Sequence, residues 1–109
     1  MRPLPGVLLL VAMGISVAAA GADTPAADGQ QLFERRCGVC HLQGQTGTTI
    51  LARRLGPERA LLAGRTDLAP EYIRQVVRAG LVNMPPLTRV ELPDAELEAI
   101  SAWLRRPRP

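Results

Sequence analysis

Large aromatic side chains are almost absent from this chain of 109 residues, which contains one Phe, one Tyr and one Trp. Hydrophobic residues make up 47% of the sequence, which is enough for a folded domain. With so few aromatic rings, however, a chain of this length builds only a thin core. Such small domains usually add a metal, disulfides or another group to complete their interior. The composition therefore predicts one small domain built around something that is not protein. The length excludes a multidomain enzyme.

Cysteine and histidine are also scarce, and lysine is absent. Two Cys cannot form a disulfide framework, and two Cys with a single His give too few ligands for a Cys/His structural zinc site. Every basic residue is Arg, and no basic stripe is interleaved with aromatic residues, so nucleic-acid binding is poorly supported. Arginine instead favours bidentate contacts with carboxylates, either on a partner or on a cofactor.

The N-terminal segment is predicted to lie outside the fold. One positive charge precedes an apolar run over residues 6–20, and small residues follow in two A-x-A-like sites. We therefore predict a signal peptide over residues 1–22, cleaved after Ala20 or Ala22, and a mature, periplasmic domain over residues 23–109. An uncleaved membrane anchor is the alternative, because the run approaches spanning length, but the small residues at its end favour cleavage.

The rest of the chain shows helical rather than strand periodicity and no internal repeat, so the predicted class is all-α. Asp28 is a plausible N-cap for the first helix, and Gly80 is placed to end the third. A glycine-rich loop over residues 42–49 and a proline-interrupted loop over residues 81–92 are expected between helices. The expected helices cover residues 29–40, 58–62, 70–79 and 94–105. Residues 50–62 are ambiguous, and the second of these helices depends on Pro57 occupying its first turn.

The motif with the clearest chemistry is Cys37-Gly38-Val39-Cys40-His41. Cys-x-x-Cys-His is the attachment motif of c-type haem, because on a helical turn all three side chains share one face. Two thiols can then add to the haem vinyl groups while His41 binds the iron. A thioredoxin-like motif would need a βαβ pattern that is absent, and a disulfide across so short a span would be strained. We predict one covalent haem c, with Cys37 and Cys40 as the thioethers and His41 as the proximal iron ligand.

The distal iron ligand is predicted by elimination. His41 is the sole histidine, and of the three methionines two lie in the signal segment, which leaves Met84. Two prolines follow it and would stiffen its loop. A thioether ligand raises the haem potential and fills the site against exogenous ligands. The other interpretation of Met84 is an ordinary filler of gaps in the core.

Together these features resemble a class I cytochrome c over essentially the whole mature chain. The resemblance is carried by Asp28-Gly29 and Phe33 before the motif, Met84-Pro85 after it, and Ala102-Trp103-Leu104 in the last helix. It implies three to five short helices around the haem. It also implies that the N- and C-terminal helices cross, with Gly29 and Phe33 packed against Trp103.

A narrower resemblance concerns partners. Glu71-Tyr72-Ile73, Val76-Val77-Arg78, Gly80 and Met84-Pro85 are similar to the cytochrome subunit of p-cresol methylhydroxylase-type flavocytochromes. That family pairs a c-type haem protein with a flavin enzyme that oxidises 4-alkylphenols. The implied function is a carrier or subunit, not itself an enzyme, that takes single electrons from a dehydrogenase and passes them to an oxidase or another cytochrome. The alternative is a haem enzyme or gas-binding sensor with an open distal site, and Met84 is the residue that discriminates the two.

The remaining candidates concern the surroundings of the haem. Class I cytochromes usually carry a proline soon after the haem histidine, whose carbonyl accepts the imidazole N–H. None occurs here before Pro57, so another backbone carbonyl is expected to serve. Arg65 is either a donor to a haem propionate or a solvated surface residue, and Tyr72 either reaches a propionate or pads the pocket. Arg53 and Arg54 are expected at the surface.

A partner surface is expected beside the haem edge. The apolar residues of the segment 81–87 either form an exposed patch there or fold inward over the haem. Arg78 and Arg89 flank this segment and are expected to steer an acidic partner.

Overall fold

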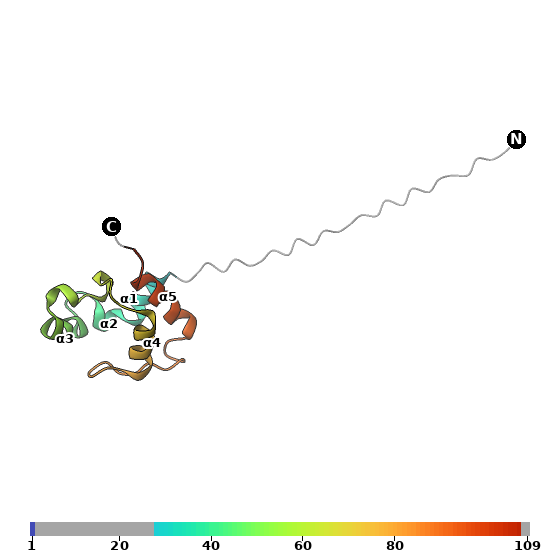
Figure 1. Ribbon diagram of the computed structural model, residues 1–109. Coiled ribbons are helices and arrows are strands. Elements are labelled where there is room, and N and C mark those ends of the chain that lie inside the picture. The colour runs from blue at the N-terminus through green and yellow to red at the C-terminus, as the bar shows by residue number, and fades with distance from the viewer. Residues whose placement is uncertain (2–27, 108–109) are drawn as a thin grey trace.

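The computed structural model describes Met1 and residues 28–107. This part of the chain contains five α-helices and no strand, which confirms the predicted all-α class (Figure 1). None of these helices is long and apolar enough to cross a membrane. The predicted signal peptide lies, apart from Met1, outside the described residues. The elements in chain order are α1 (Gly29–Arg36), α2 (Gly38–His41), α3 (Thr46–Leu55), the 3-10 turns η1 (Pro57–Arg59) and η2 (Leu62–Gly64), α4 (Pro70–Ala79) and α5 (Asp94–Leu104).

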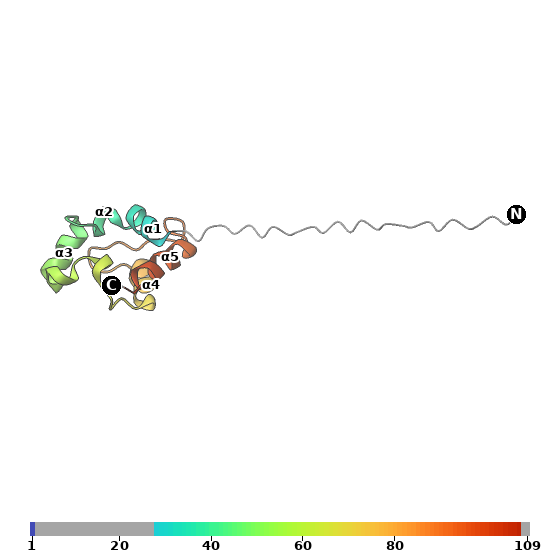
Figure 2. The same ribbon diagram turned by 90° about the horizontal axis from the view of Figure 1, so that it is seen from above.

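Helices α1 and α5 pack closely, and α5 lies between α1 and α4 (Figure 2). Asp28 caps α1 as predicted, since its Oδ1 accepts a hydrogen bond from the backbone N–H of Gln30 at 2.9 Å. The ring centroids of Phe33 and Trp103 lie 5.1 Å apart. The backbone of Gly29 lies directly against the Ala99 carbonyl and the Trp103 Cβ. The contact expected between the two terminal helices is therefore confirmed.

Gly29→Ala is expected to lower the free energy of unfolding by about 1–3 kcal/mol, the usual cost of overpacking a tight contact. The added Cβ would lie 2.6 Å from the Cβ of Trp103, so the two helices would have to separate. Gly64→Ala is the matched control, because no atom lies within 4 Å of the position of its added Cβ. Thermal unfolding of the haem-loaded proteins provides the measurement. Equal midpoints for the two variants would show that the crossing is not close-packed.

The buried core is confined to one side of the molecule. Helix α3 contributes no residue to this cluster and packs instead on α2 and η1. The half-buried α3 residues Ile50, Leu51 and Leu55 face a cavity instead. The hydrophobic core therefore does not extend to α3, and the cavity lies between them. The buried residues come from α1, α4, α5 and the segments before α4 and α5, and are Leu32, Phe33, Leu68, Ile73, Val77, Leu92, Leu97, Ile100 and Leu104.

Carboxylates on α5 pair with arginines of the neighbouring helices. Hydrogen bonds from the guanidinium groups keep the pKa of Glu96 and Glu98 below the ordinary value, and the pKa of Asp94 is lowered first by Arg89 and then by Arg78. Ion pairs at or near the surface each add little stability, so these pairs link α5 to α1 and α4 without supplying much of the free energy of folding. The pairs are Arg36–Glu96 at 2.7 Å, Arg74–Glu98 at 2.8 Å and Arg78–Asp94 at 2.6 Å.

Three predicted elements were wrong. The short helix considered over residues 58–62 is instead replaced by two 3-10 turns, η1 over Pro57–Arg59 and η2 over Leu62–Gly64. The helix predicted over residues 29–40 is interrupted at Cys37, which separates α1 from α2. The glycine-rich segment predicted as a loop becomes helical at Thr46, where α3 begins. Packing explains this early start: a Cβ on Gly47 would lie 2.6 Å from the Cys40 carbonyl oxygen, and the buried Thr48 donates its hydroxyl to the Leu42 carbonyl at 2.9 Å. These contacts hold the start of α3 against α2.

Candidate functional site

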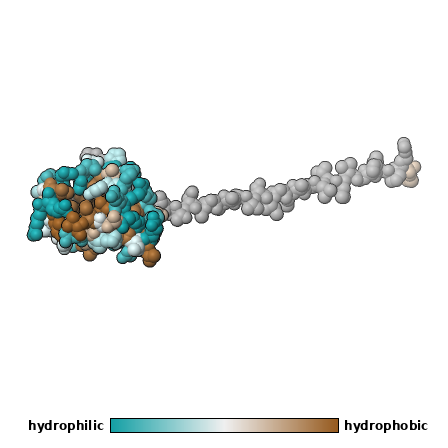
Figure 3. Space-filling model, turned by 60° about the horizontal axis from the view of Figure 1, so that its bottom comes forward, coloured by the Kyte–Doolittle hydropathy of each residue, from teal (hydrophilic) through white to brown (hydrophobic). Residues whose placement is uncertain are grey.

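A cavity of about 490 Å³ lies between α3 on one side and α4 and α5 on the other. Most of its walls are aliphatic, and the aromatic rings of Phe33 and Tyr72 also line it. In the space-filling view, hydrophobic side chains gather in the middle of one face and hydrophilic residues surround them (Figure 3). Described carboxylates are absent from the lining, whereas Arg54 and Arg65 both contribute to it. The cavity therefore suits a large apolar group that carries negative charge.

The Cys-x-x-Cys-His motif lies on the wall of this cavity. Cys37 stands at the break between α1 and α2, and Cys40 and His41 belong to α2. Cys37 and Cys40 are not joined in a disulfide, and burial raises the pKa of the Cys37 thiol to about 11. Burial lowers the pKa of His41, so its imidazole is neutral near pH 7, the form that binds metals.

One ring atom of His41 lacks the partner that the sequence led us to expect. Its Nδ1 is buried and has no hydrogen-bond partner among the described residues. The backbone carbonyl expected to replace the missing proline is therefore not in place. A buried polar atom without a partner is uncommon in a folded domain and often marks a functional group.

Met84 lines the same cavity from the segment after α4. It is half-buried and packs against the core. Leu81 and Met84 exchange two backbone hydrogen bonds, of 3.0 and 2.9 Å, which close a tight turn. Val82 within this turn has a φ of +53°, a conformation that β-branched residues seldom adopt. The structure thus brings two thiols, one imidazole and one thioether to one cavity.

Helix α3 supplies a wall that sequence reasoning missed. Gly47, Ile50, Leu51 and Arg54 line the cavity at helical spacing. That spacing is visible in the sequence and could have revealed the wall, but the preceding glycines suggested a loop. Arg54 is exposed, as predicted. It also lines the cavity, which the prediction of a surface position did not include.

Arg65 and Tyr72 also reach the cavity. The Arg65 side chain is only 12% exposed, so the interpretation of it as a solvated surface residue was wrong. Its Nε and Nη2 donate to the two carboxylate oxygens of Asp67, at 2.8 and 2.9 Å, and Arg59 donates to the same carboxylate. The hydrogen bond from Arg65 holds the pKa of Asp67 well below its ordinary value. Tyr72 lines the cavity but remains half exposed.

The segment 81–87, which was expected to meet a partner, is exposed in one part and packed against the core in another. Leu81 and Val82 are exposed, whereas Leu87 packs against the core. The expectation that Arg78 steers a partner was wrong, because its side chain is mostly buried and is committed to hydrogen bonds within the chain. Arg89 is exposed and pairs with Asp94.

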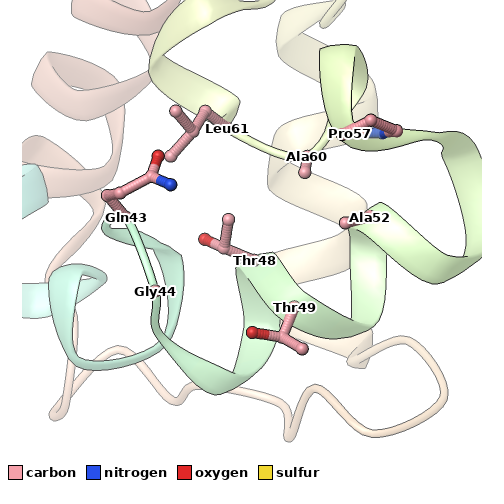
Figure 4. Close-up of a pocket in the computed structure, with 8 residues that line it drawn as sticks. All are labelled: Gln43, Gly44, Thr48, Thr49, Ala52, Pro57, Ala60 and Leu61. Atoms are coloured by element: carbon pink, nitrogen blue, oxygen red, sulfur yellow. The ribbon is translucent and has the colours of Figure 1, made fainter.

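A second cavity, of about 230 Å³, lies on the other face of α3. Figure 4 shows the Gln43 side chain leaning over it toward Thr48 and Leu61. None of its lining residues belongs to the larger cavity, so the two do not merge.

The comparisons with known proteins identify the family. A family model described as "Cytochrome C oxidase, cbb3-type, subunit III" matches residues 24–104. The chain belongs to this family. No curated protein and no solved structure matches the chain.

Membership identifies the protein as a c-type cytochrome with a class I cytochrome c fold, a covalently bound haem c and redox proteins as partners. The side chains of the larger cavity fit that cofactor, because the two thiols of a Cys-x-x-Cys-His motif attach a haem covalently, and imidazole and methionine thioether groups are usual ligands of its iron. The function at this level is electron carriage.

Proposed function

We propose that Cys37 and Cys40 would hold the haem through thioether bonds and that His41 and Met84 would both bind its iron. In each attachment a thiol S–H adds across a vinyl C=C, so no atom leaves. The observation that supports this assignment is the convergence of all four side chains on one largely apolar cavity. If His41 and Met84 both ligated the iron, they would leave no position open to substrate, and the haem would supply one-electron transfer.

We further propose that Arg65, with Tyr72, faces the haem propionates. An acid group next to apolar walls needs charged hydrogen-bond donors. Arg65 uses one edge of its guanidinium for Asp67, and its Nη1 makes no hydrogen bond within residues 28–107. Asp67 therefore orients the arginine while leaving donors for a second carboxylate. Arg54 is a further donor that lines the same cavity.

The proposed location is the periplasm, after removal of residues 1–22. The proposed donor is a dehydrogenase, with a flavin enzyme that oxidises alkylphenols as the specific candidate from the narrower resemblance. The proposed acceptor is an oxidase or another cytochrome, in agreement with the family description, which names an oxidase subunit. The exposed Val39, Leu81 and Val82 supply apolar surface for such contacts.

The test uses the haem-loaded protein as the electron acceptor. The haem-loaded chain is immobilised and exposed to periplasmic extract at low salt. The protein that it retains is expected to contain a flavin and to reduce the haem when an alkylphenol is added. The reduced haem of the chain is expected not to bind carbon monoxide. Reduction of the haem by a dehydrogenase without flavin would contradict the proposed flavin donor but would agree with a function in electron carriage. Carbon monoxide binding by the unmodified ferrous protein would instead favour the gas-binding sensor.

A further inference from the structure

Arg78, in the last turn of α4, is hydrogen-bonded to four oxygen atoms of the chain that follows it. Its Nη1 donates to the carbonyls of Leu87 and Thr88, at 3.0 and 3.2 Å. Its Nη2 donates to the carbonyl of Leu92 at 2.9 Å and to the carboxylate of Asp94 at 2.6 Å. The side chain is 21% exposed and does not line the larger cavity. Arg78 therefore binds the far end of the segment that carries Met84.

A second set of contacts holds the near end of this segment. Gly80 ends α4 with a φ of +77°, and a Cβ at this position would lie 2.8 Å from the Met84 carbonyl oxygen. The paired hydrogen bonds between Leu81 and Met84 then close the turn. Met84 thus lies between a turn anchored at α4 and the contacts of Arg78.

The link between Met84 and the Arg78 contacts is stiff. Pro85 and Pro86 have fixed φ angles and no N–H to find new partners. Directly after them, the Leu87 N–H donates to the Val77 carbonyl at 2.8 Å. Since little conformational freedom remains in between, the position of residue 87 constrains where the backbone of Met84 lies.

We infer that Arg78 is a positioning residue that keeps the Met84 thioether in the cavity. The inference rests on the proposed role of Met84 as an iron ligand. Arg78 acts through the backbone of residues 87–92 rather than by contact with the cofactor. Its planar guanidinium is required, because one group must donate in several fixed directions at once, which a lysine ammonium on a flexible stem does poorly.

This role has a measurable consequence in ligand exchange. Imidazole binds the ferric iron only in molecules whose Met84 is detached, so its apparent affinity is proportional to the detached fraction. Loss of the Arg78 contacts leaves three backbone carbonyls without that donor and loosens the segment. The detached fraction, and with it the imidazole affinity, should therefore rise.

The experiment compares Arg78→Met with Arg74→Met by absorbance titration of the ferric protein with imidazole. Arg74 lies one turn earlier on α4 and makes a two-point ion pair with Glu98 of α5. Both variants lose one positive charge and one link between α4 and α5, but Arg74 makes no hydrogen bond to the Met84 segment. Arg78→Met is expected to bind imidazole at least about tenfold more tightly than the parent, and Arg74→Met within about twofold of it.

Two further variants separate this role from a general effect on folding. In a Met84→Ala background, which already binds imidazole tightly, Arg78→Met should add nothing. An equal increase in both backgrounds, or no increase in the parent background, would overturn the positioning role while leaving Met84 as the ligand. Unchanged affinity in Met84→Ala alone would overturn the ligand assignment and with it the inference. Arg78→Lys, expected to show a smaller increase than Arg78→Met, provides the same test if Arg78→Met does not fold.

Discussion

The Cys37→Ala/Cys40→Ala double variant is expected to be largely unfolded. Without thioethers the haem is not held, and a cavity of about 490 Å³ is left between α3 and the other helices. The apolar walls of that cavity would then face water, and each large aliphatic side chain left exposed forfeits about 1.5–3 kcal/mol of burial. A few such losses approach the whole stability of an ordinary small domain, about 5–15 kcal/mol. The buried core contains no α3 residue that could compensate by closer packing.

Far-ultraviolet circular dichroism is the measurement, because it reports helix content with or without haem. Val39→Ala is the control within the same motif, since Val39 is 75% exposed and does not line the cavity. This variant should retain haem and helicity. A haem-free double variant that still unfolded cooperatively would contradict the idea that the cofactor completes the interior.

Met84→Ala is expected to open the distal side of the haem and to lower the reduction potential by on the order of 100 mV. The thioether stabilises ferrous iron, and water in its place does not. The chain contains no second histidine, and its other two methionines lie within the predicted signal peptide, so no equivalent ligand can take over. The ferrous variant should therefore bind carbon monoxide, which the parent should not.

The measurements are the sulfur-to-iron absorbance band of the ferric protein, carbon monoxide binding by the ferrous protein, and a redox titration. Leu81→Ala is the control, because Leu81 lines the same cavity in the same turn but offers no ligand atom. It should keep the band and a potential near that of the parent. If Met84→Ala also kept both, Met84 would be only a core side chain.

Local signals in the sequence were sufficient for several features of this protein. Asp28 caps α1, and Gly80 ends α4 with a positive φ. Such features depend on a few neighbouring residues, so their pattern survives in any context. The cysteine–histidine motif is equally local, because one helical turn is enough to bring its three side chains together.

Tertiary packing alone decided the rest. The start of α3 depends on the fit of Gly47 against Cys40, and the orientation of Arg65 depends on Asp67 and Arg59. Arg78 looked like a free surface charge, yet it binds the Met84 segment over sequence separations of 9 to 16 residues. An arginine can donate to whatever oxygens the fold brings near it, and its neighbours in the chain do not specify which. The sequence by itself therefore determined the chemistry of this cytochrome and most of its helices, and the tertiary structure decided which polar side chains support the cavity.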